Sequence, residues 1–124
     1  MITFNINQRA SLIALLSNPT VKHPTLQLGH EASILRNELF LTEEEKTELE
    51  YSLKETPDGV REFVNPEKAV SMTKDFEVSS ELAVSLADSY KKVYSEGFST
   101  QESEVVFPVI EKLSEVNPDK DLTK

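Results

Sequence analysis

Six prolines divide this chain of 124 residues into short segments, and this division limits the possible folds more than any other feature. Proline lacks the N–H group that a helix interior or a central strand requires, and it moves the preceding residue out of the helical region. The prolines stand at positions 19, 24, 57, 66, 108 and 118. We therefore expect short elements that end close to these positions.

The spacing of apolar residues predicts a mainly α fold, with four to five helices in a small bundle. The clearest helix follows Ser79 or Ser80, because apolar residues recur every three or four positions from there to Val93. Other helices are expected to begin after the cap residues Asn7, Thr25, Thr42, Asn65 and Ser99 or Thr100. Each of these side chains can accept a hydrogen bond from a free N–H group of the first helical turn.

The segment from residue 43 to residue 56 is expected to form a solvated helix. This helix either starts at Thr42 or continues the preceding one through a bend. Thr42 and Glu45 have the spacing of a capping box, and acidic residues in a first turn suit the positive end of the helix dipole. The helix has few apolar residues, so most of its circumference must face water. The sequence Thr-Pro-Asp-Gly that begins at Thr56 then predicts a turn.

A minor two-stranded β element is expected near the N-terminus. Residues 2–6 alternate between apolar and polar, which is typical of a half-buried strand. The partner strand is either residues 60–64 or residues 76–78. The run 105–110 has two interpretations, because its β-branched residues favour a strand whereas the wider pattern favours a helix that Pro108 kinks or splits.

Composition predicts a single helical domain over residues 1–116, followed by a polar tail over residues 117–124. The apolar runs are far shorter than the roughly 20 residues that a membrane helix needs, and no signal-peptide pattern is seen. The chain has no cysteine, which excludes disulfides, zinc–thiolate sites and iron–sulfur clusters. These features favour a cytoplasmic protein that does not contact a membrane.

The net charge of −9 is concentrated in the middle of the chain. Residues 38–67 hold ten acidic and three basic residues, a net −7, whereas residues 1–37 carry +2 and residues 68–124 carry −4. An acidic chain lacks the clustered lysines and arginines that phosphate contacts require, so direct nucleic-acid binding is not expected. The acidic segment instead predicts a protein partner with a basic surface.

The candidate partner-binding residues are five glutamates and two aromatic residues. They are Glu43, Glu44, Glu45, Glu48, Glu50, Tyr94 and Phe98. The glutamates would meet the basic surface, and the aromatic side chains, which flank Gly97 near a helix end, would anchor the partner. The alternative for the glutamates is a capped and solvated helix face with no further role.

No residue pattern indicates catalysis, a metal site or a cofactor. The Gly-rich phosphate loop, the nucleophile elbow and a cysteine nucleophile are all missing from the sequence. His23 and His30 are separated by Pro24, so we do not expect them to share a helix face. A metal site at these histidines would need carboxylates from elsewhere in the fold. The sequence therefore favours a protein that is not an enzyme.

The layout of the chain resembles that of small acidic proteins encoded by tailed bacteriophages. The resemblance rests on four features: the Met-Ile-Thr-Phe start, the Thr-Glu-Glu-Glu-Lys helix, the Thr-Pro-Asp-Gly turn and the Glu-Gly-Phe-Ser-Thr-Gln-Glu segment at residues 96–102. It implies a non-enzymatic role in the host cytoplasm, as an inhibitor of host machinery or as an assembly or connector factor.

These observations predict a protein-interaction module, such as a phage-encoded inhibitor or regulator that binds a basic surface of a host protein through residues 38–67. The alternative is a structural or assembly component, a connector or chaperone, that self-associates into homo-oligomers. The apolar seams of the helices over 82–94 and 105–113 favour this alternative, because they are wider than a bundle of this size must bury.

Overall fold

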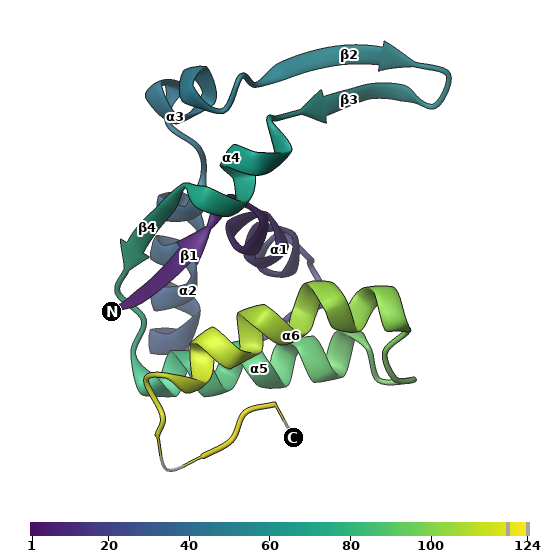
Figure 1. Cartoon of the computed structure of the whole chain (residues 1–124). Helices are drawn as coiled ribbons and strands as arrows, with labels where there is room; N and C mark the ends of the chain where they lie inside the picture. Colours follow the sequence, from purple (N-terminus) through teal and green to yellow (C-terminus); the bar gives the residue numbers. More distant parts are fainter. Residues whose placement is uncertain (119, 124) are drawn as a thin grey trace.

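The computed structural model describes residues 1–118 and 120–123, which fold into six helices and two separate two-stranded antiparallel sheets (Figure 1). The helices are α1 (Ile6–Leu16), α2 (Leu26–Leu39), α3 (Glu43–Glu48), α4 (Pro66–Ser71), α5 (Ser80–Val93) and α6 (Thr100–Ser114). The strands are β1 (Ile2–Asn5), β2 (Ser52–Thr56), β3 (Gly59–Phe63) and β4 (Thr73–Phe76). The mainly α character is confirmed, whereas the expected four to five helices and single β element are too few.

Side-chain caps set the helix starts, and most of these caps could be predicted. The expected caps that the structure confirms are Thr25, Thr42, Asn65, Ser79 and Ser99. The cap of α1 is Asn5 instead of Asn7, and Asn5 and Gln8 form a reciprocal capping box with N–O distances of 2.8 and 2.9 Å. The chain therefore passes directly from β1 into α1.

The strands β1 and β4 pair antiparallel and draw the N-terminal segment into the main core (Figure 1). Ile2 lies opposite Phe76, and both side chains are buried. Of the two partners considered for residues 2–6, the later segment is used, but the strand ends at Phe76 instead of covering 76–78. Val78 is buried beyond the end of the strand, which is why its apolar character suggested a strand residue.

The main core lies among β1, β4, α1, α2, α5 and α6. Helix α5, which runs beside α6 in Figure 1, contributes the longest buried apolar stripe. The apolar members of this stripe are Leu82, Ala83, Leu86, Ala87 and Tyr90. Because the stripe is covered within the chain, its width is no longer an argument for pairing with a second copy.

Helix α6 runs through Pro108, so the strand interpretation of residues 105–110 is wrong. Pro108 leaves the carbonyl of Glu104 without its usual helical donor, but Glu104 is exposed and water can bond this carbonyl. Val106 and Val109 are buried at helical spacing. Their packing outweighs the preference of β-branched residues for strands.

Helix α3 ends at Glu48, well short of the expected end. Glu50 has a positive φ of 58°, the left-handed conformation that usually selects glycine. The N–H of Tyr51 donates to the carbonyl of Lys46 at 2.9 Å, and the N–H of Glu50 donates to the carbonyl of Thr47 at 3.2 Å. This pair of bonds is a Schellman motif, which ends the helix although no glycine is present.

The residues after α3 form a β-hairpin, β2–β3, that projects from the rest of the molecule (Figure 1). The expected turn joins the two strands, and Gly59 there has a φ of 116°. The two strands pair only with each other among the described residues, and every residue of β3 is exposed. An isolated two-stranded hairpin is at best marginally stable in water, so the contacts at its base must hold it.

A second, smaller apolar cluster supports the base of the hairpin. Its buried members are Ile6, Leu49 and Ala69. The N–H of Asn65 donates to the carbonyl of Leu49 at 2.8 Å, and Nζ of Lys68 donates to the carbonyl of Glu48 at 3.0 Å. The two ends of the hairpin are thus tied to each other, to α1 and to α4.

The expected polar tail, residues 117–124, includes positions 119 and 124, which lie outside the described residues. Its described part packs on the domain. Leu122 is only 2% exposed and belongs to the main core, and Nδ2 of Asn117 donates to the carbonyl of Ser80 at 3.0 Å. A single leucine among polar and charged residues gave no periodic signal, so this contact could not be predicted.

We expect Leu122→Ala to lower the free energy of unfolding by about 2–4 kcal/mol, because it removes a buried side chain from a closed core. The matched control is Leu53→Ala in β2, where the leucine is 60% exposed and the change is expected to stay within about 0.5 kcal/mol. Urea unfolding followed by circular dichroism measures both. Equal effects of the two substitutions would contradict the packing of the C-terminal segment.

Candidate functional site

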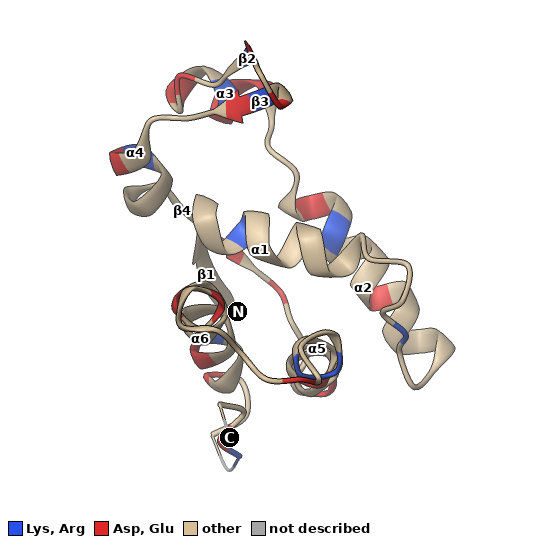
Figure 2. Cartoon of the chain, turned by 90° about the vertical axis from the view of Figure 1, so that its right-hand side faces the viewer, with Lys and Arg blue, Asp and Glu red and all other residues tan. Residues whose placement is uncertain are grey.

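The acidic segment of the chain folds into one lobe beside the main core. Residues 42–67, which we call the acidic lobe, comprise α3, the β2–β3 hairpin and the start of α4 (Figure 2). They include nine acidic and three basic residues, a net charge of −6. Most of the surplus negative charge of the chain is thus placed on a part that stands apart from the main core.

The hairpin has two chemically different faces. Alternate residues of a strand point to opposite sides, and Leu53 lies opposite Glu62 while Glu55 lies opposite Val60. One face therefore combines two apolar side chains with two carboxylates, and Leu53 and Val60 are 60% and 63% exposed. The other face includes the side chains of Lys54, Arg61 and Phe63, with Nζ of Lys54 5.1 Å from the centre of the Phe63 ring.

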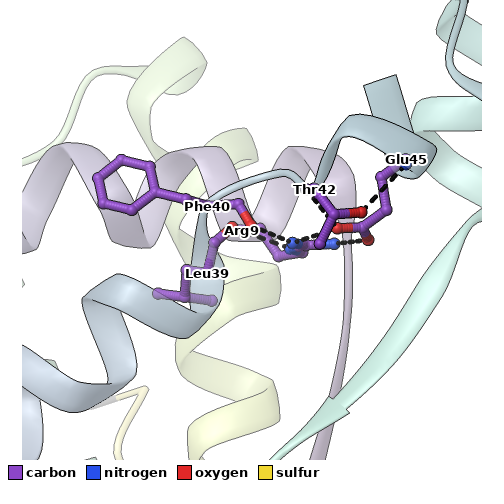
Figure 3. Close-up of polar contacts among 5 residues, drawn as sticks. All are labelled: Arg9, Leu39, Phe40, Thr42 and Glu45. Carbon is purple, nitrogen blue, oxygen red and sulfur yellow. Dashed lines mark hydrogen bonds and ion pairs between the residues drawn. The ribbon is translucent and has the colours of Figure 1, made fainter. Parts of the chain in front are cut away.

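One candidate residue, Glu45, proves to be a structural link between the lobe and the core (Figure 3). Both of its carboxylate oxygens accept hydrogen bonds from Arg9, and the Nη2–Oε1 distance is 3.1 Å. Arg9 is 1% exposed and also donates from Nε to the carbonyl of Leu39 and from Nη2 to that of Phe40, each at 3.1 Å. Oε1 of Glu45 additionally accepts from the N–H of Thr42 at 3.0 Å.

This network explains how a charged side chain can lie in the core. The guanidinium of Arg9 is surrounded by a carboxylate and two carbonyls, so its charge is paired and most of its N–H donors are used. The hydrogen bond from Arg9 lowers the pKa of Glu45 to about 2. Arg9 was not singled out from the sequence, and the only signal was its place three residues after Ile6 on the buried stripe of α1.

The other four candidate glutamates are exposed on the lobe. Glu43 lies 3.6 Å from Nζ of Lys46, and Oε2 of Glu50 accepts a hydrogen bond from Nδ2 of Asn65 at 2.6 Å. Glu44 and Glu48 are both exposed. Surface charges of this kind contribute little to stability, so these glutamates are available to a partner where Glu45 is not.

A groove runs between the lobe and α1. It has a volume of about 460 Å³. Its α1 wall is apolar or small at Ala10, Ile13 and Ala14, and Phe40 lines the segment that leads into α3. Tyr51 and Glu62 line its other side, joined by a hydrogen bond of 3.0 Å from the tyrosine hydroxyl. The face of the hairpin that carries Glu62, Leu53 and Val60 therefore continues from this groove.

The two aromatic candidates, Tyr94 and Phe98, lie together but far along the chain from the lobe. Their ring centroids are 5.0 Å apart, and Phe98 is 41% exposed. Phe98 also lines a small hollow of about 150 Å³ with Phe107 of α6. Tyr94 is half-buried and packs against the main core, so Phe98 is the more accessible of the two.

The histidines lie on different elements, as expected. His23 is in the loop between α1 and α2, and His30 is within α2. No three histidine or carboxylate side chains of the described residues lie close enough together to hold a metal ion. Among the same residues, no helix is both long and apolar enough to cross a membrane.

Comparison with protein-family models, with curated proteins and with solved structures finds no match to this chain.

The ion pair between Arg9 and Glu45 makes stability depend on pH in the acidic range. The pKa of Glu45 is lowered in the folded state from 4.5 to about 2, so its contribution is complete above pH 4.5 and is lost as the pH falls toward 2. Such a shift corresponds to about 3 kcal/mol, and partial exposure of the carboxylate reduces it to about 2 kcal/mol. When the pH is lowered from 4.5 toward 2, we therefore expect the wild-type protein to lose about 2 kcal/mol more free energy of unfolding than Glu45→Gln does.

Urea titrations of both proteins at several pH values measure this difference. The variant Glu43→Gln is the matched control, because Glu43 is exposed and its ion pair with Lys46 is 3.6 Å long. It is expected to follow the wild-type curve. Parallel curves for wild type and Glu45→Gln would show that the carboxylate does not sense Arg9.

Because Glu50 has a left-handed backbone conformation, we expect the glycine variant to be more stable than the alanine variant there, the reverse of the order within a helix. At this position we expect Glu50→Gly to be more stable than Glu50→Ala by about 1 kcal/mol, because only glycine lacks the Cβ clash. At the exposed residue Glu111 within α6, alanine should be better by about 1 kcal/mol. Thermal or urea unfolding of the four variants measures both differences. If glycine and alanine rank in the same order of stability at both positions, the Schellman motif is contradicted.

Proposed function

We propose that this protein is a non-enzymatic interaction module that binds a basic surface of another protein through the acidic lobe. The observation that carries the proposal is the projecting hairpin, whose groove-side face combines exposed Leu53 and Val60 with two carboxylates. An isolated two-stranded hairpin cannot bury its own apolar side chains in a core, so the exposed apolar side chains on it are best explained by a partner.

The charge and the apolar surface would have different roles. Negative charge on the lobe raises the rate of association with a basic partner and restricts which partners are accepted. Affinity depends more on buried apolar and aromatic anchors, which the hairpin face and the groove with Phe40 supply. We therefore propose a partner segment that combines basic residues with apolar ones.

The resemblance to acidic phage proteins makes an inhibitor or regulator of a host protein the specific form of this proposal. A nucleic-acid-handling protein is a suitable target, because its phosphate-binding groove is basic and would accept the lobe in place of phosphates. In this form the protein acts in the host cytoplasm and needs no cofactor.

Self-association as an assembly or connector component is the second candidate. The buried stripe of α5 does not support it, but Phe98 just before α6 and Val105 and Phe107 within α6 are exposed apolar side chains. Light scattering at working concentration distinguishes the two candidates. A stable oligomer that Phe98→Ser together with Phe107→Ser disperses would favour assembly over the lobe proposal.

The lobe proposal is tested by charge reversal at positions whose side chains form no hydrogen bond or ion pair with the described residues. After the partner has been captured from host extract and purified, we expect Glu44→Lys, Glu48→Lys and Glu55→Lys in one protein to weaken binding by about 100-fold at low salt. Wild-type affinity should also fall between about 50 and 300 mM salt, as screening of exposed charges requires. Glu45 is left intact because its pairing with Arg9 supports the fold.

The matched control carries the same change in net charge outside the lobe, at Glu96, Glu104 and Glu111, all of which are exposed. It is expected to keep affinity within a few-fold of wild type, because exposed charges far from the contact are screened. An equal loss of affinity in both triple variants would show that the effect comes from the net charge and not from the lobe. Unchanged binding in both would refute the lobe as the contact surface.

A further inference from the structure

Helix α2 separates its charges onto two sides. Glu31 and Glu38 line one hollow, which Glu77 also borders, whereas Arg36 lines a different one. The second hollow lies between α2 and the segment that follows α1, within the part of the sequence that is net positive. It lies outside the acidic lobe, and the proposed function makes no use of it.

The hollow beside Arg36 is polar, and none of the described residues lines it with a carboxylate. It has a volume of about 300 Å³. The polar side chains that line it are those of Ser17, Asn18, His23, Ser33 and Arg36. Because no acidic side chain lines it, the hollow is unsuited to a cation and holds an excess of hydrogen-bond donors.

Arg36 is the centre of this excess. Its Nε is buried and has no hydrogen-bond partner, and no hydrogen bond or ion pair joins the guanidinium of Arg36 to any of the described residues. A buried donor of a charged group without an acceptor is costly, and native proteins rarely leave one unpaired. Arg9, by contrast, has two carbonyls and a carboxylate around its guanidinium.

The neighbouring side chains do not pair with Arg36 but can help it to hold an anion. Oδ1 of Asn18 already accepts from the N–H and the hydroxyl of Thr20, at 2.9 and 2.7 Å. Nδ1 of His23 lies 3.2 Å from the hydroxyl oxygen of Ser85, which leaves its other ring nitrogen without a partner among the described residues. The hydroxyls of Ser17 and Ser33 add two donors to the same lining.

Gly29 keeps one side of the hollow open. A Cβ built there would meet no atom within 4 Å, so this side of α2 offers space instead of a packed contact. Among the described residues, no phenylalanine, tyrosine or tryptophan lines the hollow, which argues against a nucleobase or another flat ring as the ligand. The lining is suited to a compact group with several acceptor oxygens.

We propose that the hollow formed by Arg36, Ser33, Ser17 and His23 binds the phosphoryl group of a phosphate monoester. A phosphoryl group presents three terminal oxygens, which matches a guanidinium fork and two hydroxyls better than the two oxygens of a carboxylate do. The group comes either from a small phosphorylated metabolite or from a phosphorylated side chain of a partner protein.

The site is tested by titrating the ¹⁵N-labelled full chain with inorganic phosphate, glycerol phosphate and a short phosphoserine peptide at constant ionic strength. We expect saturable shifts of the amide signals of Ser17, Gly29 and Ser33. Glycerol phosphate binding as tightly as the peptide would indicate a metabolite, and a peptide that binds roughly tenfold more tightly would indicate a partner's side chain.

Arg36→Met keeps an unbranched apolar stem and removes the guanidinium with its charge, so we expect it to weaken binding about tenfold or more. The control is Arg61→Met on the hairpin, where the arginine is exposed and paired with Asp58 at 3.4 Å, and binding should not change. Should Arg36→Met fail to fold, Ser33→Ala tests the same site at an exposed position. Absent saturation, or equal binding by wild type and Arg36→Met, would overturn the proposal.

Discussion

The buried guanidinium of Arg9 is the constraint on which the arrangement of this molecule depends. A charge placed in a core must be paired there, and the groups that pair it come from three different parts of the chain: the end of α2, the linker after it and α3. These partners can be satisfied only when α3 sits over the start of α1. Arg9, which is not itself part of the lobe, thus holds the lobe in place together with the second apolar cluster of Ile6, Leu49 and Ala69.

This arrangement gives the acidic residues of the lobe different tasks. Glu45 neutralises Arg9, and Glu50 ends α3 and bonds Asn65 at the base of the hairpin. The other exposed carboxylates of α3 and of the hairpin lie on elements whose positions depend on these contacts. The net charge of the lobe does not distinguish structural glutamates from those that can contact a partner; only the side-chain contacts do.

Local signals could be read from the sequence, whereas signals that depend on distant partners could not. The caps of five helices and the turn between β2 and β3 follow from side chains within a few residues, so they were predicted. The end of α3 was missed because a glutamate occupies the position that glycine usually marks. The burial of Arg9 and Leu122 was missed because their partners are remote in the sequence. Among the candidate residues, the sequence identified the acidic segment that forms the lobe but could not separate Glu45, which pairs with Arg9, from its neighbours.

The hairpin has a further consequence for how the protein behaves in concentrated solution. Both of its outer edges are unpaired among the described residues, and such edges are templates on which other strands add. Its strands are short and carry charged side chains of both signs, which is how natural proteins discourage this addition. The same charged side chains that would select a partner therefore also reduce aggregation. A variant engineered for tighter contact by replacing them with apolar residues would lose colloidal stability along with its selectivity.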